Sequence, residues 1–184
     1  MGKHRVGIIG LGIMGRRMVV NFNNHPLFEI VGVWDPSEQS ISKTKIDNPS
    51  IFISEGPTEM ISNGRIDLLY VACPPEFHKA YALMAIEQKI PVYLEKPLGV
   101  DITESKELVH ELNKSKTPNI VNFVQASCEA MEITQNELRS GSAGEVTSVD
   151  IVMQYQQWPR SWQLEADWLR FRSAGGYALS LIHI

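Results

Sequence analysis

The feature that most constrains this chain is the hexapeptide Gly10-Leu11-Gly12-Ile13-Met14-Gly15, which follows a short apolar run and opens a segment of helical spacing. Three glycines at this spacing permit a tight strand-to-helix turn, close approach of a pyrophosphate to the backbone, and close packing of the helix. The N-terminus of that helix offers N–H groups and a partial positive charge to a phosphate. The motif predicts a dinucleotide site, and a ligand-free turn is the alternative. The expected cofactor contacts here are Gly10, Gly12, Ile13, Met14 and Gly15.

The first 125 or so residues alternate short apolar runs with longer segments of helical spacing, a pattern typical of βαβ units. We therefore predict an α/β fold, a Rossmann-type doubly wound parallel sheet, followed by the incomplete start of a second α+β domain. Strands are predicted at 5–9, 29–34, 51–53, 67–72, 92–94 and 119–124, and helices at 12–22, 57–63, 77–88 and 102–115. For the last helix, Asp101 or Thr103 is the expected cap, and Leu108 with Leu112 forms the apolar stripe.

The rhythm changes after residue 123. A helix is predicted at 129–140, a turn at 141–144 and an antiparallel strand at 145–157. We expect a dinucleotide-binding domain over residues 1–123 and the truncated start of a second domain over residues 124–178. Residues 179–184 are the direct translation of CTG TCT CTT ATA CAC ATC, a transposon end sequence used to prepare sequencing libraries, and our hypothesis is that they form a non-native tail.

Composition narrows the class of protein. The 184 residues carry 17 Lys and Arg against 21 Asp and Glu, a net charge of −4, and 43% are hydrophobic. Such a chain can bury a core, and without a basic block it does not match proteins that grip nucleic-acid phosphates. Two cysteines cannot build a disulfide framework, and the glycine-broken apolar run near the start is too short to span a bilayer. We expect a cytoplasmic protein without a nucleic-acid partner, a membrane partner or a metal site.

An acidic residue, Asp35, follows the second predicted strand about twenty residues beyond Gly15. At this position a carboxylate can accept hydrogen bonds from ribose hydroxyls and repels a 2′-phosphate, so NAD is favoured over NADP. Lys43 and Lys45 lie close enough in sequence to offset part of that repulsion, and NADP is kept as an alternative. A simple turn aspartate before Pro36 is the other interpretation.

Two further strands end in residues suited to a ligand site at the carboxyl edge of the sheet. Cys73-Pro74-Pro75 follows the fourth predicted strand, where the prolines fix the turn and leave carbonyls free to line a cofactor. His78 is either a ligand-facing donor or a structural residue, and Cys73 is interpreted as a small buried residue, not a nucleophile. Glu95-Lys96-Pro97 follows the fifth strand. Lys96 could transfer a proton to or from a substrate hydroxyl, and a solvated ion pair with Glu95 is the alternative.

Together these motifs resemble the Gfo/Idh/MocA oxidoreductases, over residues 3 to about 124. The resemblance rests on the glycine hexapeptide, on Asp67 through Pro74 with His78, and on Glu95-Lys96-Pro97. It implies a nicotinamide-binding Rossmann domain, a second domain whose open sheet forms the substrate wall, and a homo-oligomeric full-length protein.

The resemblance also implies an activity and residue roles. The family oxidises a secondary hydroxyl of a sugar, polyol or related small molecule, or reduces the keto form. Lys96 would be the catalytic lysine that handles the hydroxyl proton. The remaining expected cofactor-site residues are Cys73, Pro74, His78, Glu95, Pro97 and Lys96 itself.

Two departures from the family pattern bear on the substrate. The stretch 124–127 lacks an expected arginine, and after Gly175-Gly176 the position of an expected Asp is Leu179, although His183 falls near the place of an expected His. The truncated second domain would also lack most of the sheet that positions the substrate, and hydride transfer depends steeply on such positioning, so we expect this chain to bind cofactor without turnover. A non-catalytic dinucleotide-binding module or redox sensor is the main alternative. An enzyme similar to glucose-6-phosphate dehydrogenase is disfavoured because no basic phosphate clamp is evident.

Overall fold

The computed structural model describes residues 2–150, 152, 154, 156–157, 164 and 166–176. The described residues up to Asn122 and from Leu164 onward form one compact unit, and those from Phe123 to Gln157 form a second. The predicted tail at 179–184, with Leu179 and His183, lies outside the described residues. The domain limits predicted at residues 123 and 178 stay predictions.

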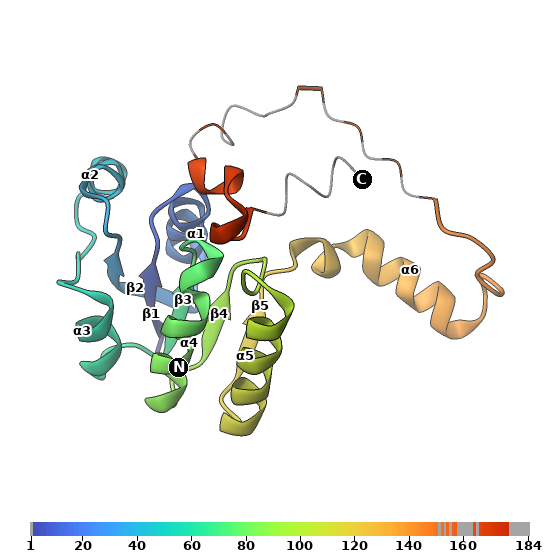
Figure 1. Cartoon of the computed structure of the whole chain (residues 1–184), viewed down its shortest axis with the longest axis horizontal. Helices are drawn as coiled ribbons and strands as arrows, with labels where there is room; N and C mark the ends of the chain where they lie inside the picture. Colours follow the sequence, from blue (N-terminus) through green and yellow to red (C-terminus); the bar gives the residue numbers. More distant parts are fainter. Residues whose placement is uncertain are drawn as a thin grey trace. The chain divides into compact units, whose positions relative to one another are not determined.

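The first unit is built on a five-stranded parallel sheet in the order β2-β1-β3-β4-β5 (Figure 1). The predicted Rossmann-like fold is thereby confirmed. β2 lies on one side of β1, whereas β3, β4 and β5 follow on the other side, so the strand order reverses between β1 and β3. Sheets of this type bind ligands at the carboxyl edge where the order reverses. The strands are β1 His4–Ile9, β2 Phe28–Trp34, β3 Leu68–Val71, β4 Val92–Leu94 and β5 Asn119–Val121.

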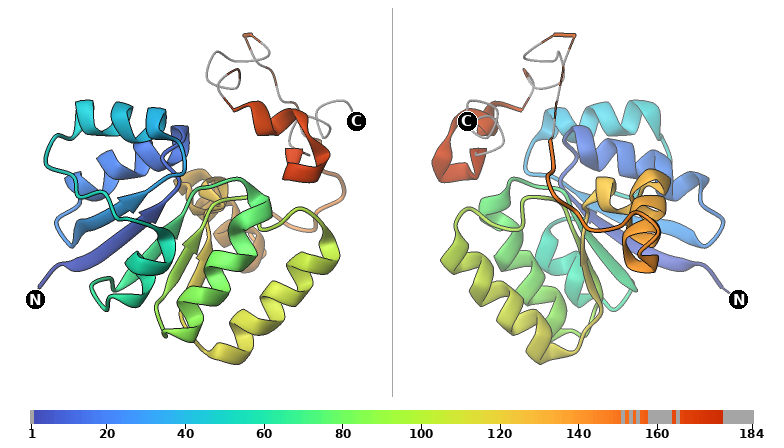
Figure 2. Two further views of the ribbon diagram at one scale, coloured as in Figure 1. Left: turned by 60° about the vertical axis from the view of Figure 1, so that its left-hand side comes forward. Right: turned by 90° about the vertical axis from the view of Figure 1, so that its right-hand side faces the viewer.

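Helices cover both faces of this sheet (Figure 2). One face packs against three helices and the other against α1, with residues of α2 at its margin. The helices are α1 Ile13–Asn24, α2 Glu38–Asp47, α3 Pro57–Ser62, α4 His78–Glu87, α5 Ile102–Ser115 and α6 Glu129–Ser140, of which α6 belongs to the second unit. Short 3-10 turns lie at Pro75–Phe77, Val124–Ser127, Asp167–Arg170 and Arg172–Ala174.

Alternation along the strands divides the core between the two faces. Ile8 and Tyr70 pack with Phe22 of α1, whereas their neighbours Ile9 and Val71 belong to the cluster under α3, α4 and α5. Successive strand residues point to opposite faces. Because both faces are covered, the central strands are apolar throughout, which is why they stand out as continuous runs in the sequence.

Most predicted elements are present, and three in the first unit differ. The strand predicted at 119–124 is shorter, because β5 ends at Val121 and Val124 already begins a 3-10 turn. The helix α2 was not predicted because it is mostly polar, with Thr44 as its buried residue and a cap made by Ser37, whose side chain accepts from the Ser40 N–H. The strand predicted at 51–53 is an isolated bridge between Val33 and Ile53, since only a short stretch runs beside β2. The cap of α5 is Asp101, and its Leu108 is buried as predicted.

In the second unit, α6 has its predicted bounds, but the antiparallel strand predicted at 145–157 is wrong. The described residues of that range carry no strand, and all of them are exposed. Alternating apolar residues form a strand when a neighbouring strand pairs with them and a core covers one face. The described chain supplies no such neighbour for this stretch. The described residues contain no helix with the length and apolarity needed to cross a bilayer.

Candidate functional site

The glycine loop after β1 fits a pyrophosphate. Gly10 has φ +94°, and a Cβ there would lie 2.5 Å from the Cys73 amide nitrogen. A Cβ on Gly15 would lie 1.8 Å from the Gly10 carbonyl oxygen, so neither position accepts a side chain. A Cβ on Gly12, in contrast, would meet nothing within 4 Å. The loop is therefore tightly packed on the protein side and open at Gly12.

The helix that follows the loop is ready to receive an anion. Gly12 is the N-cap of α1, no side chain caps the helix, and its first turn contains no acidic residue. The N–H groups at a helix N-terminus need partners, and a phosphate is suited to supply them. Ile13 and Met14, in that first turn, are half-buried.

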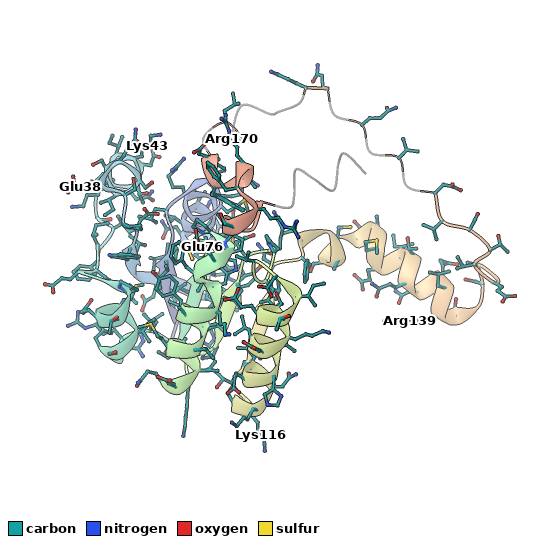
Figure 3. The ribbon with its side chains drawn as sticks, in the orientation of Figure 1. Glu38, Lys43, Glu76, Lys116, Arg139 and Arg170 are labelled. Atoms are coloured by element: carbon teal, nitrogen blue, oxygen red, sulfur yellow. The ribbon has the colours of Figure 1, made fainter. Side chains whose placement is uncertain are left out.

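Asp35, the residue after β2, hydrogen-bonds to the glycine loop. One carboxylate oxygen accepts from the Leu11 N–H at 2.6 Å, and the other accepts from the Ser37 N–H at 2.8 Å. Asp35 thus acts as a turn aspartate and also fixes the loop. A carboxylate offers about four lone-pair sites, so acceptor capacity remains for ribose hydroxyls. Lys43 lies on α2, as does the acidic Glu38 (Figure 3).

The turn after β3 connects that strand to α4. His78 is fully buried, and its Nε2 lies 2.9 Å from the Cys73 carbonyl oxygen, to which it donates. Burial lowers the pKa of His78, so the imidazole is neutral at neutral pH. Burial also raises the pKa of the Cys73 thiol to about 12, which keeps it protonated and agrees with its interpretation as a non-nucleophile. The expected contacts of Cys73, Pro74 and His78 with a cofactor stay predictions.

Gly175, the first residue of the pair Gly175-Gly176, packs against this same turn. Gly175 has φ +86°, and a Cβ there would lie 2.9 Å from both Cβ and Cγ of Pro75. A Cβ on Gly176 would lie 2.4 Å from the Leu169 carbonyl oxygen. Glycine is therefore required at both positions by contact within the first unit.

Two adjacent charged residues at the carboxyl end of β4 differ in burial. Glu95 is buried at 5% exposure, whereas the side chain of Lys96 is exposed. No ion pair joins these two side chains among the described residues, so the solvated-pair interpretation of Glu95 and Lys96 is wrong. Instead, the Tyr70 hydroxyl and the Asn122 amide each donate to Glu95 Oε1 at 2.5 Å. Pro97 follows Lys96 through a cis peptide bond.

Tyr70 and Asn122 were not predicted as site residues. A signal was present for Tyr70, since it interrupts an apolar strand with a hydroxyl that needs a partner when buried. For Asn122 the sequence offers no comparable signal, because its partners lie on other strands.

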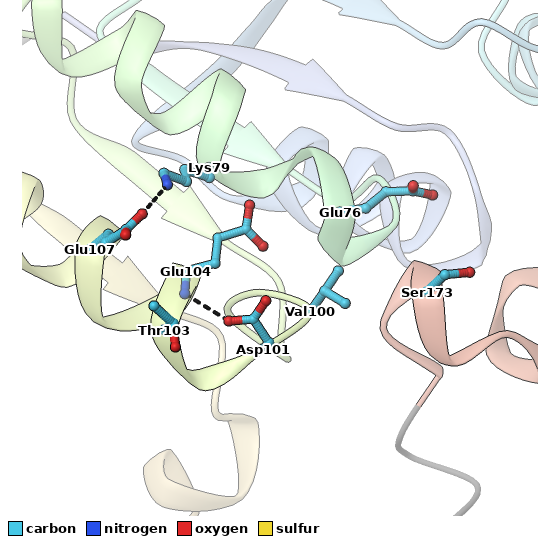
Figure 4. Close-up of a pocket in the computed structure, with 8 residues that line it drawn as sticks. All are labelled: Glu76, Lys79, Val100, Asp101, Thr103, Glu104, Glu107 and Ser173. Carbon is cyan, nitrogen blue, oxygen red and sulfur yellow. Dashed lines mark hydrogen bonds and ion pairs between the residues drawn. The ribbon is translucent and has the colours of Figure 1, made fainter.

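A separate hollow lies between the first turns of α4 and α5 (Figure 4). Its charged lining is mostly acidic: Glu76, Asp101, Glu104 and Glu107, with Lys79 paired to Glu107 at 2.6 Å. Carboxylates repel an anionic dinucleotide, so this hollow is a poor cofactor site. The described residues contain no group of three or more His, Cys, Asp or Glu placed to hold a metal ion.

Comparison with known proteins identifies a family and several relatives. The model of the GFO_IDH_MocA oxidoreductase family, described as an NAD-binding Rossmann fold, matches residues 4–123. The chain is 27% identical over 144 residues to an inositol 2-dehydrogenase of Corynebacterium glutamicum, covering 77% of this chain and 43% of that protein. It is 24% identical over 178 residues to the rhizopine catabolism protein MocA of Rhizobium meliloti, covering 97% and 53%.

Solved structures agree with this match. A myo-inositol dehydrogenase from Lactobacillus casei, crystallised with NAD(H) and myo-inositol, superposes with a TM-score of 0.70 at 26% identity, over 77% of this chain and 42% of that one. The scyllo-inositol dehydrogenase of the same organism, with NAD(H) and scyllo-inositol, gives a TM-score of 0.72 at 18% identity, over 79% and 43%. The chain spans about half the length of the curated relatives it matches.

Proposed function

The chain belongs to the Gfo/Idh/MocA family of NAD-binding oxidoreductases, and we propose that it carries the cofactor domain of a dehydrogenase. The substrate class is a sugar, polyol or related small molecule, and the reaction interconverts a secondary hydroxyl and a carbonyl. NAD is the expected cofactor, with NADP as the alternative. Residues 1–123 form the cofactor domain, and residues 124–178 begin a substrate and oligomerisation domain of a cytoplasmic homo-oligomer.

The observation that carries this proposal is the arrangement of the sheet's carboxyl edge. The glycine loop follows β1, Asp35 follows β2, and Lys96 follows β4. Parallel strands bring these three segments to one edge. The glycine loop has its open face at Gly12, and Lys96 is exposed at the same edge.

Each group has a role in that reaction. The glycine loop and the uncapped N-terminus of α1 bind the pyrophosphate, and Asp35 accepts from the ribose. A bound nicotinamide supplies hydride transfer. Lys96 accepts or donates the hydroxyl proton, which requires its amine to lie within hydrogen-bond reach of the substrate oxygen.

The activity is tested with Lys96→Met in a longer version of the protein that includes a complete second domain. Turnover of a polyol panel should fall by about 10²-fold or more, because proton transfer is lost, while NADH affinity by fluorescence titration is retained. Lys106→Met, an exposed lysine on α5, is the matched control. Unchanged turnover in the Lys96→Met protein would contradict the catalytic role of Lys96. NADH binding without turnover by the longer wild-type protein would instead support a non-catalytic sensor. The 184-residue chain alone should bind NADH without turning over a polyol.

A further inference from the structure

A buried carboxylate, that of Glu95, immediately precedes the exposed lysine in the chain. Glu95 Oε1 receives the Tyr70 hydroxyl and the Asn122 amide, each at 2.5 Å, and Glu95 Oε2 receives the Lys96 N–H at 3.3 Å. A buried carboxylate is costly unless donors satisfy it. Here the donors come from β3, from the residue after β5 and from the Lys96 backbone, so the carboxylate ties three strand ends together.

The orientation of the Asn122 amide is fixed from its other side. The Tyr93 hydroxyl donates to Asn122 Oδ1 at 2.7 Å, which leaves the NH₂ group to face Glu95. Tyr93 is on β4, next to Leu94, so the network returns to the strand that carries Glu95. Asn122 is itself buried, and no water is needed to complete these bonds.

The titratable groups around Glu95 are Tyr70, Tyr93, His78 and Lys96. Burial, and then the hydrogen bond to Glu95, raise the pKa of Tyr70, and burial followed by the charge of Glu95 raises the pKa of Tyr93. Both hydroxyls therefore remain protonated and able to donate at neutral pH. His78 is neutral because burial lowers its pKa. The fixed positive charge nearest in sequence to Glu95 is the ammonium of Lys96.

We propose that Tyr70 and Asn122 are positioning residues that act through the Glu95 carboxylate to fix the Lys96 segment at the edge of the sheet. This rests on the proposed function in one respect, the role of Lys96 in proton transfer. The Tyr70 and Asn122 donors hold the carboxylate inward, away from the lysine side chain. The Lys96 amine is thereby kept free for a substrate oxygen instead of being held in an ion pair with its own neighbour.

The test measures Lys96 itself and needs neither cofactor nor substrate. The 184-residue chain is labelled with an amine-reactive acetylating reagent across the ordinary pKa range of lysine, and the labelling of Lys96 is followed by peptide mass spectrometry. In Tyr70→Phe the carboxylate loses a buried donor and interacts more strongly with the ammonium. The midpoint for Lys96 should rise, and its labelling at neutral pH should slow by about threefold or more.

A double-mutant cycle shows whether the effect passes through Glu95. In a Glu95→Gln background, Tyr70→Phe should leave the Lys96 profile unchanged, because residue 95 then carries no negative charge that could act on the Lys96 ammonium. Tyr93→Phe, which frees the Asn122 amide, should shift the Lys96 midpoint in the same direction by less, and keeps the test valid if Tyr70→Phe does not fold. Tyr81→Phe, on α4, is the matched control and should shift nothing.

Two results overturn the proposal. One is a Tyr70→Phe protein with a lower unfolding temperature but an unchanged Lys96 profile, which would make the network structural only. The other is an equal shift in the presence and absence of the Glu95 carboxylate. A parallel NADH titration of the wild-type chain tests the proposed function separately, because the labelling result does not depend on cofactor binding.

Discussion

Two helices of similar pattern, α5 and α6, have opposite environments. Both have the bounds that the sequence predicts, Ile102–Ser115 and Glu129–Ser140. Yet α5 buries Leu108 and Leu112 against the sheet, whereas α6 has no buried residue among those described. The comparison teaches that an amphipathic pattern specifies a helix and its apolar face, while the partner of that face depends on the rest of the chain.

The largest effect is expected from truncating a buried leucine on α5. Leu108→Ala should lower the free energy of unfolding by about 3 kcal/mol, because a side chain exposed by 1% leaves a cavity when truncated. Leu138→Ala, on α6 at 43% exposure, is the matched control and should cost well under about 1 kcal/mol. Urea unfolding followed by circular dichroism measures both. Equal costs would show that the apolar face of α6 is also packed.

A smaller effect concerns the two helix starts. The Asp101 side chain caps α5 by accepting from the Glu104 N–H at 2.8 Å, whereas the N-cap of α6, Cys128, makes no side-chain cap bond. Asp101→Ala should therefore cost about 1 kcal/mol. Cys128→Ala should leave stability nearly unchanged, since no cap is lost. Thermal unfolding of the two variants compares them, and a matching loss in Cys128→Ala would contradict this account.

The smallest effect concerns an ion pair between residues far apart in the sequence, compared with a hydrogen bond inside one helix. In the first unit, Arg5 and Asp67 pair at 2.8 Å, and the Arg5 hydrogen bonds lower the pKa of Asp67 to about 2. Because the pKa of Asp67 is lower in the folded state than in the unfolded state, the pair stabilises the fold at pH values above about 4. That stability is lost as the pH falls from about 4 toward 2. The pair is about 40% exposed, so salt screens it and the gain is modest.

This pH dependence is read from urea midpoints measured across the acid range. Asp67→Asn should flatten the decline in stability between about pH 4 and pH 2, because the titrating group is gone. On α6, Thr134 bonds to Ala130 within the same helix, so Thr134→Val serves as a control that leaves the acid profile unchanged. An unaltered acid profile in Asp67→Asn would show that the pair does not contribute.

Local sequence signals were enough for much of the fold. The glycine hexapeptide marked the β1–α1 turn because its requirements are local: a positive φ at Gly10 and close packing at Gly15. The apolar runs marked β1, β3 and β4 because both faces of the sheet are covered. The helix α5 was bounded correctly because its cap and its stripe lie within one segment.

Features that depend on distant partners could not be predicted. Tyr70 and Glu95 are 25 residues apart, and Glu95 and Asn122 are 27 apart, so their bonds arise only when β3, β4 and β5 align. The strand predicted at 145–157 failed for the same reason, since its pattern needs a partner strand that the described chain does not supply. The bond from Leu11 to Asp35 likewise emerges from the sheet order, although both residues stand in recognisable motifs.

The central claim is that the glycine loop after β1 binds a dinucleotide at Gly12. It is tested most directly by NADH fluorescence titration of the wild-type chain, of Gly12→Ala, and of Gly56→Ala as a matched control, since a Cβ at either glycine meets nothing within 4 Å of the protein. Because both glycines are N-caps, where alanine is less favourable, we expect a similar small loss of unfolding temperature in both variants. The affinity for NADH should fall about tenfold or more, or about 1.4 kcal/mol, in Gly12→Ala alone. Wild-type affinity in Gly12→Ala, or no saturable binding by the wild-type chain, would contradict it.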